Sequence, residues 1–150
     1  MTSIGGSNHV IRDVLDNPSD IIFYAQRLAT FKKWCYDKED TPCSSEKLAR
    51  AGFYFSGTRA DPSAATCAFC KKEMIFDATD DPWAEHKSHS EHCVFVELNK
   101  LDETEWTVRD FLKLATGRVA AETRSWMLKE ADKFRSGADD VEKMATSKMK

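Results

Sequence analysis

The stretch Cys67-Ala68-Phe69-Cys70 decides the fold of this chain, together with a histidine and a cysteine further along. Fifteen residues separate Cys70 from His86, and six separate His86 from Cys93. Three thiolates and one imidazole form a complete tetrahedral ligand set of the kind that zinc prefers. We therefore predict one structural Zn²⁺, bound by Cys67, Cys70, His86 and Cys93. His89 is the rival histidine ligand, because it lies one helical turn after His86.

This ligand set leaves no open position on the metal. A catalytic zinc keeps one coordination site free for water, and the sequence offers no Ser-His-Asp pattern either. We therefore expect a protein that is not an enzyme, in which the metal is part of folding. The remaining cysteines, Cys35 and Cys43, lie far upstream without a partner at ligand spacing, and we expect both to be small buried residues.

Length and charge narrow the classes of protein further. The chain has 150 residues, 31% of them charged, with a formal net charge of -3. That length suits one domain with an appendage. A sequence pI near 5.8 argues against strong direct binding to DNA. No run reaches the roughly 18 apolar residues of a membrane span, and the first residues lack a secretory signal pattern, so we expect a soluble intracellular protein with reduced thiols.

Three short aromatic or β-branched runs predict a small antiparallel meander at residues 53–55, 66–69 and 73–76. A helix is expected over 19–33, with Ser19 or Asp20 as its N-cap. Ser44 predicts the start of a second helix, over 45–50, which Gly52 closes in a left-handed conformation. Asp80-Asp81-Pro82 predicts a third, which carries His86 and His89 on one face.

After residue 101 the pattern becomes that of one long helix. No proline occurs from Val108 to Phe134, and Thr107 with Asp110 predicts a capping box. We expect the helix to span 107–136 and to end at Ser136-Gly137. Apart from its first turn, it would project some 30 Å from a small domain, so its apolar stripe requires a partner helix. The stripe consists of Val108, Phe111, Leu112, Val119 and Trp126.

The predicted fold class is therefore α+β, a small zinc-bound domain with a three-stranded sheet and short helices, followed by a long C-terminal helix. The expected segments are a flexible arm at 1–18, the zinc domain at 19–98, a linker at 99–106, the helix at 107–136 and a frayed tail at 137–150. The arm carries one apolar patch, which we expect to dock locally, formed by Val10, Ile11, Val14 and Leu15.

Several motifs in order resemble the baculoviral inhibitor-of-apoptosis repeat (BIR) family. They are RLATFKKW at 27–34, LARAGFY at 48–54, DDPWAEH at 80–86 and CVF at 93–95. The resemblance covers about residues 20–98. One such repeat followed by a long helix is similar to the survivin-like (deterin-like) members of the family. The resemblance implies a three-stranded sheet with short helices around one zinc.

Many members of this family hold a free protein N-terminus in a groove beside the third strand. The survivin-like members read a histone tail phosphorylated on its third residue, a threonine. They form the targeting module of the chromosomal passenger complex with borealin, INCENP and, indirectly, Aurora kinase. The resemblance thus implies an adaptor of chromosome segregation and cytokinesis in the nucleus, at centromeres and at the spindle midzone, and also in the cytoplasm. The alternative is an apoptosis inhibitor that binds alanine-led N-termini of caspases or their antagonists.

The resemblance also assigns roles to individual residues. Asp80 would pair with the α-ammonium group of the peptide, with Phe76, at a usual tryptophan position, and Met74 beside it. Lys72 and His89 would face the phosphate, to which both can make charge-assisted hydrogen bonds. The segment between Cys70 and His86 is one residue shorter than in typical members, so Ile75 or Asp77 falls where a second carboxylate can stand. Self-association of the isolated chain as a homodimer, through Val108, Phe111 and Leu112, would compete with complex formation.

Overall fold

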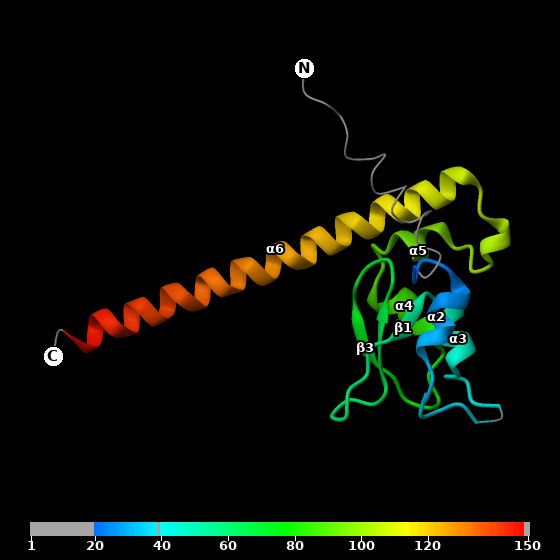
Figure 1. Ribbon diagram of the computed structural model, residues 1–150, viewed down its shortest axis with the longest axis horizontal. Helices are drawn as coiled ribbons and strands as arrows, with labels where there is room; N and C mark the ends of the chain where they lie inside the picture. The colour runs from blue at the N-terminus through cyan, green and yellow to red at the C-terminus, as the bar shows by residue number, and fades with distance from the viewer. Residues whose placement is uncertain (1–19, 39, 149–150) are drawn as a thin grey trace, which may run out of the picture.

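The computed structural model describes residues 20–38 and 40–148, in which a small domain is followed by one long projecting helix (Figure 1). This arrangement confirms the α+β class. The three-stranded sheet has the order β1-β2-β3, with both neighbouring pairs antiparallel. The elements are α2 (Tyr24–Thr30), α3 (Ser45–Arg50), β1 (Phe53–Phe55), β2 (Ala64–Cys67), β3 (Glu73–Ile75), α4 (Pro82–His89), α5 (Val94–Leu98), the 3-10 helix η1 (Glu103–Glu105) and α6 (Val108–Ser147).

The middle strand β2 connects the sheet to the predicted metal site. All four of its residues are buried, and Cys67 at its end pairs with Phe53 of β1. The strand stops at Cys67, two residues earlier than predicted, because the Cys67 thiol accepts the next available amides. Phe69 and Cys70 donate their N–H groups to Cys67 Sγ at 3.3 and 3.5 Å. These two hydrogen bonds turn the chain after β2 and hold the Cys67 thiol in the predicted metal site.

Aromatic rings and one buried arginine form the core of the domain. The rings of Phe69 and Phe95 stack with centroids 4.6 Å apart, which joins the loop after β2 to α5. Arg27 of α2 is fully buried, and its Nε donates to the Ala49 carbonyl at 2.8 Å. Its guanidinium lies 5.5 Å from the centre of the Phe69 ring, a cation–π distance. The core therefore links α2, α3, the sheet and α5.

Helix α2 begins later than predicted. It starts at Tyr24 after Phe23, and the predicted cap Ser19 lies outside the described residues. The prediction of Asp20 as N-cap is wrong, because its carboxylate accepts the Ile22 N–H at 2.9 Å and pairs with Arg118 of α6. The first amide of α2, that of Tyr24, instead donates to the Glu103 carboxylate at 2.8 Å. A residue 79 positions later thus caps this helix.

Helices α3 and α4 start as predicted, and α5 is an addition. Ser44 accepts the Lys47 N–H, and Asp81 accepts the N–H groups of Trp83 and Ala84 ahead of α4. Gly52 has a φ of 96°, and a Cβ there would lie 2.9 Å from the Phe95 ring. Glycine at this position therefore satisfies both the left-handed turn and the close approach of α5.

Helix α6 begins at the predicted capping box but ends later than predicted. Thr107 accepts the Asp110 N–H, and the Asp110 carboxylate accepts the Thr107 N–H. The helix continues to Ser147, so the predicted stop at Ser136-Gly137 and the frayed tail from 137 are wrong. A single glycine costs a helix about 1 kcal/mol but does not end it when no proline follows.

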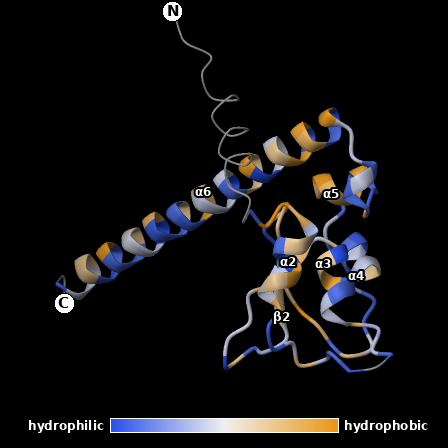
Figure 2. Ribbon diagram, turned by 45° about the vertical axis from the view of Figure 1, so that its right-hand side comes forward, coloured by the Kyte–Doolittle hydropathy of each residue, from blue (hydrophilic) through white to orange (hydrophobic). Residues whose placement is uncertain are grey.

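The first part of α6 packs on the domain and the rest extends away from it. Leu114 and Ala115 are buried. A Cβ on Gly117 would lie 2.7 Å from Val94 Cγ1, so α6 and α5 approach closely. Orange and blue segments alternate along the projecting part in Figure 2, as apolar and polar residues do in an amphipathic helix. Within the described residues, no helix has a segment both long and apolar enough to span a membrane.

Candidate metal centre and interaction surfaces

The four predicted zinc ligands converge on one point. Their ligand atoms all lie within 4.8 Å of one another. Cys67 Sγ is 3.9 Å from Cys93 Sγ, and Cys70 Sγ is 3.7 Å from His86 Nε2. A tetrahedral zinc with ordinary Zn–S and Zn–N bonds requires separations of about 3.8 and about 3.6 Å. The donor set and its spacing therefore fit one tetrahedral Zn²⁺.

Each ligand is positioned by a different element, and the histidine is also oriented by the backbone. Cys67 ends β2, Cys70 lies in the turn before β3, His86 is in α4 and Cys93 precedes α5. The His86 Nδ1 lies 2.8 Å from the Ala51 carbonyl oxygen, which fixes Nδ1 as the donor and leaves Nε2 for the metal. The ring orientation thus comes from the loop after α3.

His89 does not belong to this cluster. It is exposed, and its Nε2 lies 3.3 Å from the Glu85 carboxylate on the outer side of α4. His86, one turn earlier, is fully buried. The structure therefore selects His86 over its rival.

The environment of the cluster perturbs the pKa of its members. Burial raises the pKa of the Cys67 thiol well above its usual value, whereas hydrogen bonds with Cys67 and Cys93 lower the pKa of Cys70. For His86, burial lowers the pKa, but hydrogen bonds with Cys70 and Cys93 outweigh it and raise the pKa to about 9. Metal binding requires deprotonated thiols and a neutral imidazole, so zinc affinity depends on pH.

Residues 27–97 match the family model described as the Inhibitor of Apoptosis domain, BIR. "Baculoviral IAP repeat-containing protein 5" of Mus musculus is 36% identical over 124 residues, which covers 79% of this chain and 87% of the relative. The chain belongs to the BIR family. Its BIR domain is survivin-like, and Cys67, Cys70, His86 and Cys93 are positioned to hold the one zinc that BIR domains bind.

Two nematode BIR proteins are also similar. "Chromosomal passenger complex protein bir-1" of Caenorhabditis elegans is 47% identical over 94 residues, or 62% of this chain and 58% of the relative. "Baculoviral IAP repeat-containing protein bir-2" of the same species is 40% identical over 119 residues, or 77% of this chain and 39% of the relative. The aligned part of the chain thus spans less than two thirds of either relative.

The structure brings together the two residues predicted to face a phosphate. The Lys72 ammonium donates a hydrogen bond to the backbone carbonyl of His89, at the end of α4. Both side chains are exposed, and the Glu85 carboxylate lies 3.3 Å from the His89 Nε2. Two potential cations therefore stand next to each other on the outer surface of the BIR domain.

The predicted peptide groove is only partly as expected. Phe76 is 1% exposed and packs edge-on against Phe53 at 5.1 Å, so its prediction as a groove wall is wrong. The reason is strand alternation, because Ile75 faces solvent and the next side chain turns into the core. Met74 is half-buried on β3. The Asp80 carboxylate is half-buried and accepts the Asp77 N–H at 2.7 Å, which stabilises the turn before α4.

The predicted stripe on α6 divides into two parts. Phe111 stacks on Phe23 of the BIR domain at 6.2 Å, and Leu112 lines the same cavity. Val108, Val119 and Trp126 are exposed, Trp126 at 62%. The side of α6 that carries Phe111 and Leu112 therefore packs back on the domain, while the other three members of the stripe are exposed, Val108 of the first turn among them.

Sequence reasoning misplaced one cysteine and missed three connections. Cys43 is buried as expected, but Cys35 is exposed, so its predicted burial is wrong. The missed connections are the Glu103 cap on α2, the Asp20–Arg118 pair and the Gly117 contact with Val94. All three join positions at least 23 residues apart, and no local pattern signals them. The glycine in an otherwise regular helix was the one available cue, since it permits close packing.

Proposed function

We propose that this protein is a non-enzymatic adaptor of the chromosomal passenger complex. In this proposal α6 assembles with borealin- and INCENP-like helices and so directs an Aurora-type kinase to chromosomes, centromeres and the spindle midzone during segregation and cytokinesis. The observation that carries it is the apolar surface of α6 outside the domain, where Trp126, Phe134 and Val141 are all more than 60% exposed. Large exposed apolar residues along a helix are typical of a partner interface. The name of the relative bir-1 supports the same complex.

The BIR domain would direct the complex to chromosomes by binding a histone tail phosphorylated on its third residue, a threonine. Lys72 and His89 can both donate charge-assisted hydrogen bonds to a phosphate. Between residues 73 and 93, acidic residues such as the exposed Glu73, Asp77 and Asp81 outnumber the single Lys87, which favours a basic tail. Asp80, with the oxygen that does not accept the Asp77 N–H, would hold the α-ammonium group of the tail.

A peptide-binding experiment tests this reading. We expect an alanine-led histone-tail peptide to bind the zinc-loaded protein more tightly when its third residue is phosphorylated, in a fluorescence anisotropy titration. His89→Ala should remove about tenfold of that preference, because one charged hydrogen bond is worth about 1.5–3 kcal/mol. His92→Ala is the matched control, since His92 is 90% exposed beside Glu91 in the loop that follows α4. Equal affinity for both peptides would favour the second candidate function, capture of alanine-led tails by an apoptosis inhibitor.

The helix interface needs a separate experiment. Leu112→Glu combined with Val119→Glu should abolish co-purification of borealin- and INCENP-like helices, because each would bury an unpaired charge. Thr116→Glu combined with Thr123→Glu adds the same two charges at the same spacing on exposed polar positions and should leave assembly within a few-fold. Zinc content, measured by elemental analysis, should not change in either variant. Assembly retained by the Leu112 and Val119 variant would contradict the proposal.

A further inference from the structure

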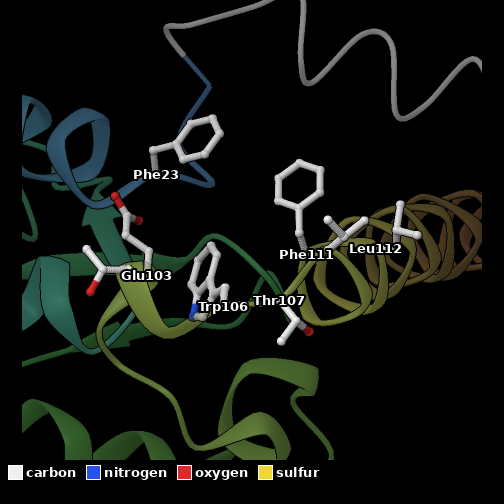
Figure 3. A pocket seen from close by; sticks show the side chains of 8 residues that line it. Phe23, Glu103, Trp106, Thr107, Phe111 and Leu112 are labelled. Atoms are coloured by element: carbon white, nitrogen blue, oxygen red, sulfur yellow. The ribbon is translucent and has the colours of Figure 1, made fainter.

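A cavity lies between the BIR domain and the start of α6, where the stripe of that helix begins. Its volume is 570 Å³, within the range of roughly 300–1,000 Å³ typical of pockets that bind a small ligand. Figure 3 shows Phe23, Trp106 and Phe111 standing around it, with Leu112 on the next part of α6. The Phe23 and Phe111 rings are stacked, and the Trp106 indole donates to the Lys100 carbonyl at 3.0 Å. Its walls are therefore fixed and aromatic.

The polar groups around this cavity already have partners within the protein. The Glu103 carboxylate accepts the Tyr24 N–H, and the Thr107 hydroxyl accepts the Asp110 N–H at 3.2 Å. What the cavity offers to an occupant is therefore apolar contact with aromatic rings and with Val108 and Leu112. An occupant must bring aliphatic or aromatic side chains rather than charge.

The N-terminal segment enters the described domain at the wall of this cavity. Phe23 donates its N–H to the carbonyl of Asp20 at 3.2 Å, so Asp20 is one tight turn from a lining residue. The Asp20 carboxylate is paired with Arg118 of α6. The described chain therefore begins at a point held between the cavity and α6, and residues 1–19, which precede it, lie outside the described residues.

That segment carries one apolar patch, and its spacing fits such an occupant. Val10, Ile11, Val14 and Leu15 occupy positions i, i+1, i+4 and i+5, which share one face of a helical turn. Leu15 is five residues from Asp20, a distance of at most about 18 Å when the chain is extended. The cavity wall at Phe23 is thus within reach, and the intervening residues include Pro18, which would end a helical turn.

We propose that the patch formed by Val10, Ile11, Val14 and Leu15 docks into the cavity lined by Phe23, Trp106, Phe111 and Leu112, and covers the start of the α6 stripe. A short tether gives the patch an effective concentration in the millimolar range. A second copy or a partner helix that contacts Val108, Phe111 and Leu112 must therefore displace it. The docking is independent of the proposed function, whereas its effect on assembly rests on the proposed role of α6.

Nuclear magnetic resonance on the full-length, zinc-loaded protein tests the docking directly. We expect nuclear Overhauser contacts between the methyl groups of Val14 and Leu15 and the ring protons of Phe23, Trp106 and Phe111. Val14→Asp combined with Leu15→Asp should abolish them and shift the ring resonances. Arg12→Ala combined with Asp13→Ala, on the other face of the same turn, is the matched control and should leave them unchanged. Absence of these contacts in the unaltered protein would overturn the proposal.

Assembly measurements then test the consequence. If the patch covers the cavity in nine molecules of ten, the Val14 and Leu15 variant should bind partner helices about tenfold more tightly than the unaltered chain. If the ring contacts are present but the variant and the unaltered chain bind partner helices equally well, the docking stands and the proposed competition with partner helices is wrong. Loss of partner binding in every variant, with ring contacts intact, would overturn the proposed function of α6 alone. The two proposals can therefore fail separately.

Discussion

The zinc centre and the outer half of α6 are stabilised in opposite ways. The zinc ligands come from four separate elements and, apart from the half-buried Cys70, are almost completely buried. From residue 131 to residue 148 every side chain of the chain is exposed, and the pairs there are local, such as Arg135 with Asp132 at 3.3 Å. Exposed pairs of this kind contribute little stability. The domain is thus fixed by contacts between distant residues, and the outer helix by neighbours only.

This difference separates what the chain does alone from what it does with a partner. Isolated helices in water are marginal, since their stability comes mostly from packing of an apolar face. Exposed residues such as Phe134 and Val141 on the outer part of α6 have no such packing within the described chain. The BIR domain should therefore keep its structure in any assembly, while the order of the outer helix should depend on what covers it.

Removing a zinc ligand should destabilise the BIR domain much more than the outer helix. We expect Cys93→Ser to abolish cooperative unfolding of the BIR domain, because structural zinc contributes about 10–16 kcal/mol in zinc-finger peptides, as much as the whole stability of most domains. Elemental analysis should show no retained zinc, and proton NMR should lose its dispersion. The helical circular dichroism signal should fall only in part.

Cys35→Ser is the matched control for that variant. Cys35 is exposed and lies outside the ligand cluster, so the same atomic change should alter the free energy of unfolding by less than about 0.5 kcal/mol. A folded Cys93→Ser protein with normal dispersion would show that the core does not depend on the metal.

The same contrast explains what the sequence could predict. The ligand set, the meander, the caps at Ser44 and Asp81 and the Thr107 capping box follow from local spacing, and the structure confirms them. The start of α2 could not be predicted, because its first amide is satisfied by Glu103 from another element. The end of α6 was misjudged because a serine and a glycine were given more weight than the absence of proline.

The surface residues show a further limit. The resemblance to the BIR family placed Lys72 beside His89 correctly, and each residue lies two or three positions after a zinc ligand. The resemblance failed for Phe76, because this side chain directly after β3 packs against Phe53 in the core, and only three-dimensional packing decides that. Residues held by the metal were therefore easier to place than residues held by packing.

Two glycines of α6 provide a smaller test with opposite expected signs. Gly117→Ala should lower the free energy of unfolding by about 1 kcal/mol, because the added Cβ would lie 2.7 Å from Val94 Cγ1 and the cost of overpacking exceeds the gain in helix propensity. Gly137→Ala meets no atom within 4 Å and should stabilise the outer helix by about the same amount. Thermal unfolding should detect the first change and amide hydrogen exchange in α6 the second. Equal effects at the two positions would mean that α6 is not docked through Gly117.

The smallest expected effect concerns the residue that starts α6. A hydrogen bond from Lys100, with the Thr107 N–H, lowers the pKa of Asp110 to about 2. A carboxyl group whose pKa is lower in the folded state stabilises it fully above its unfolded value near 4, and this contribution is lost as the pH falls toward 2. Asp110→Asn should therefore speed amide exchange in the first turn of α6 by about two- to fivefold, and the difference should stay constant between pH 8 and pH 5. Exchange measured by NMR at these two pH values checks this, with exchange in the outer helix beyond Gly137 as the internal reference. A difference that shrinks between pH 8 and pH 5 would contradict a lowered pKa for Asp110, because a carboxyl group that titrates at or below its ordinary value stays ionised across that range.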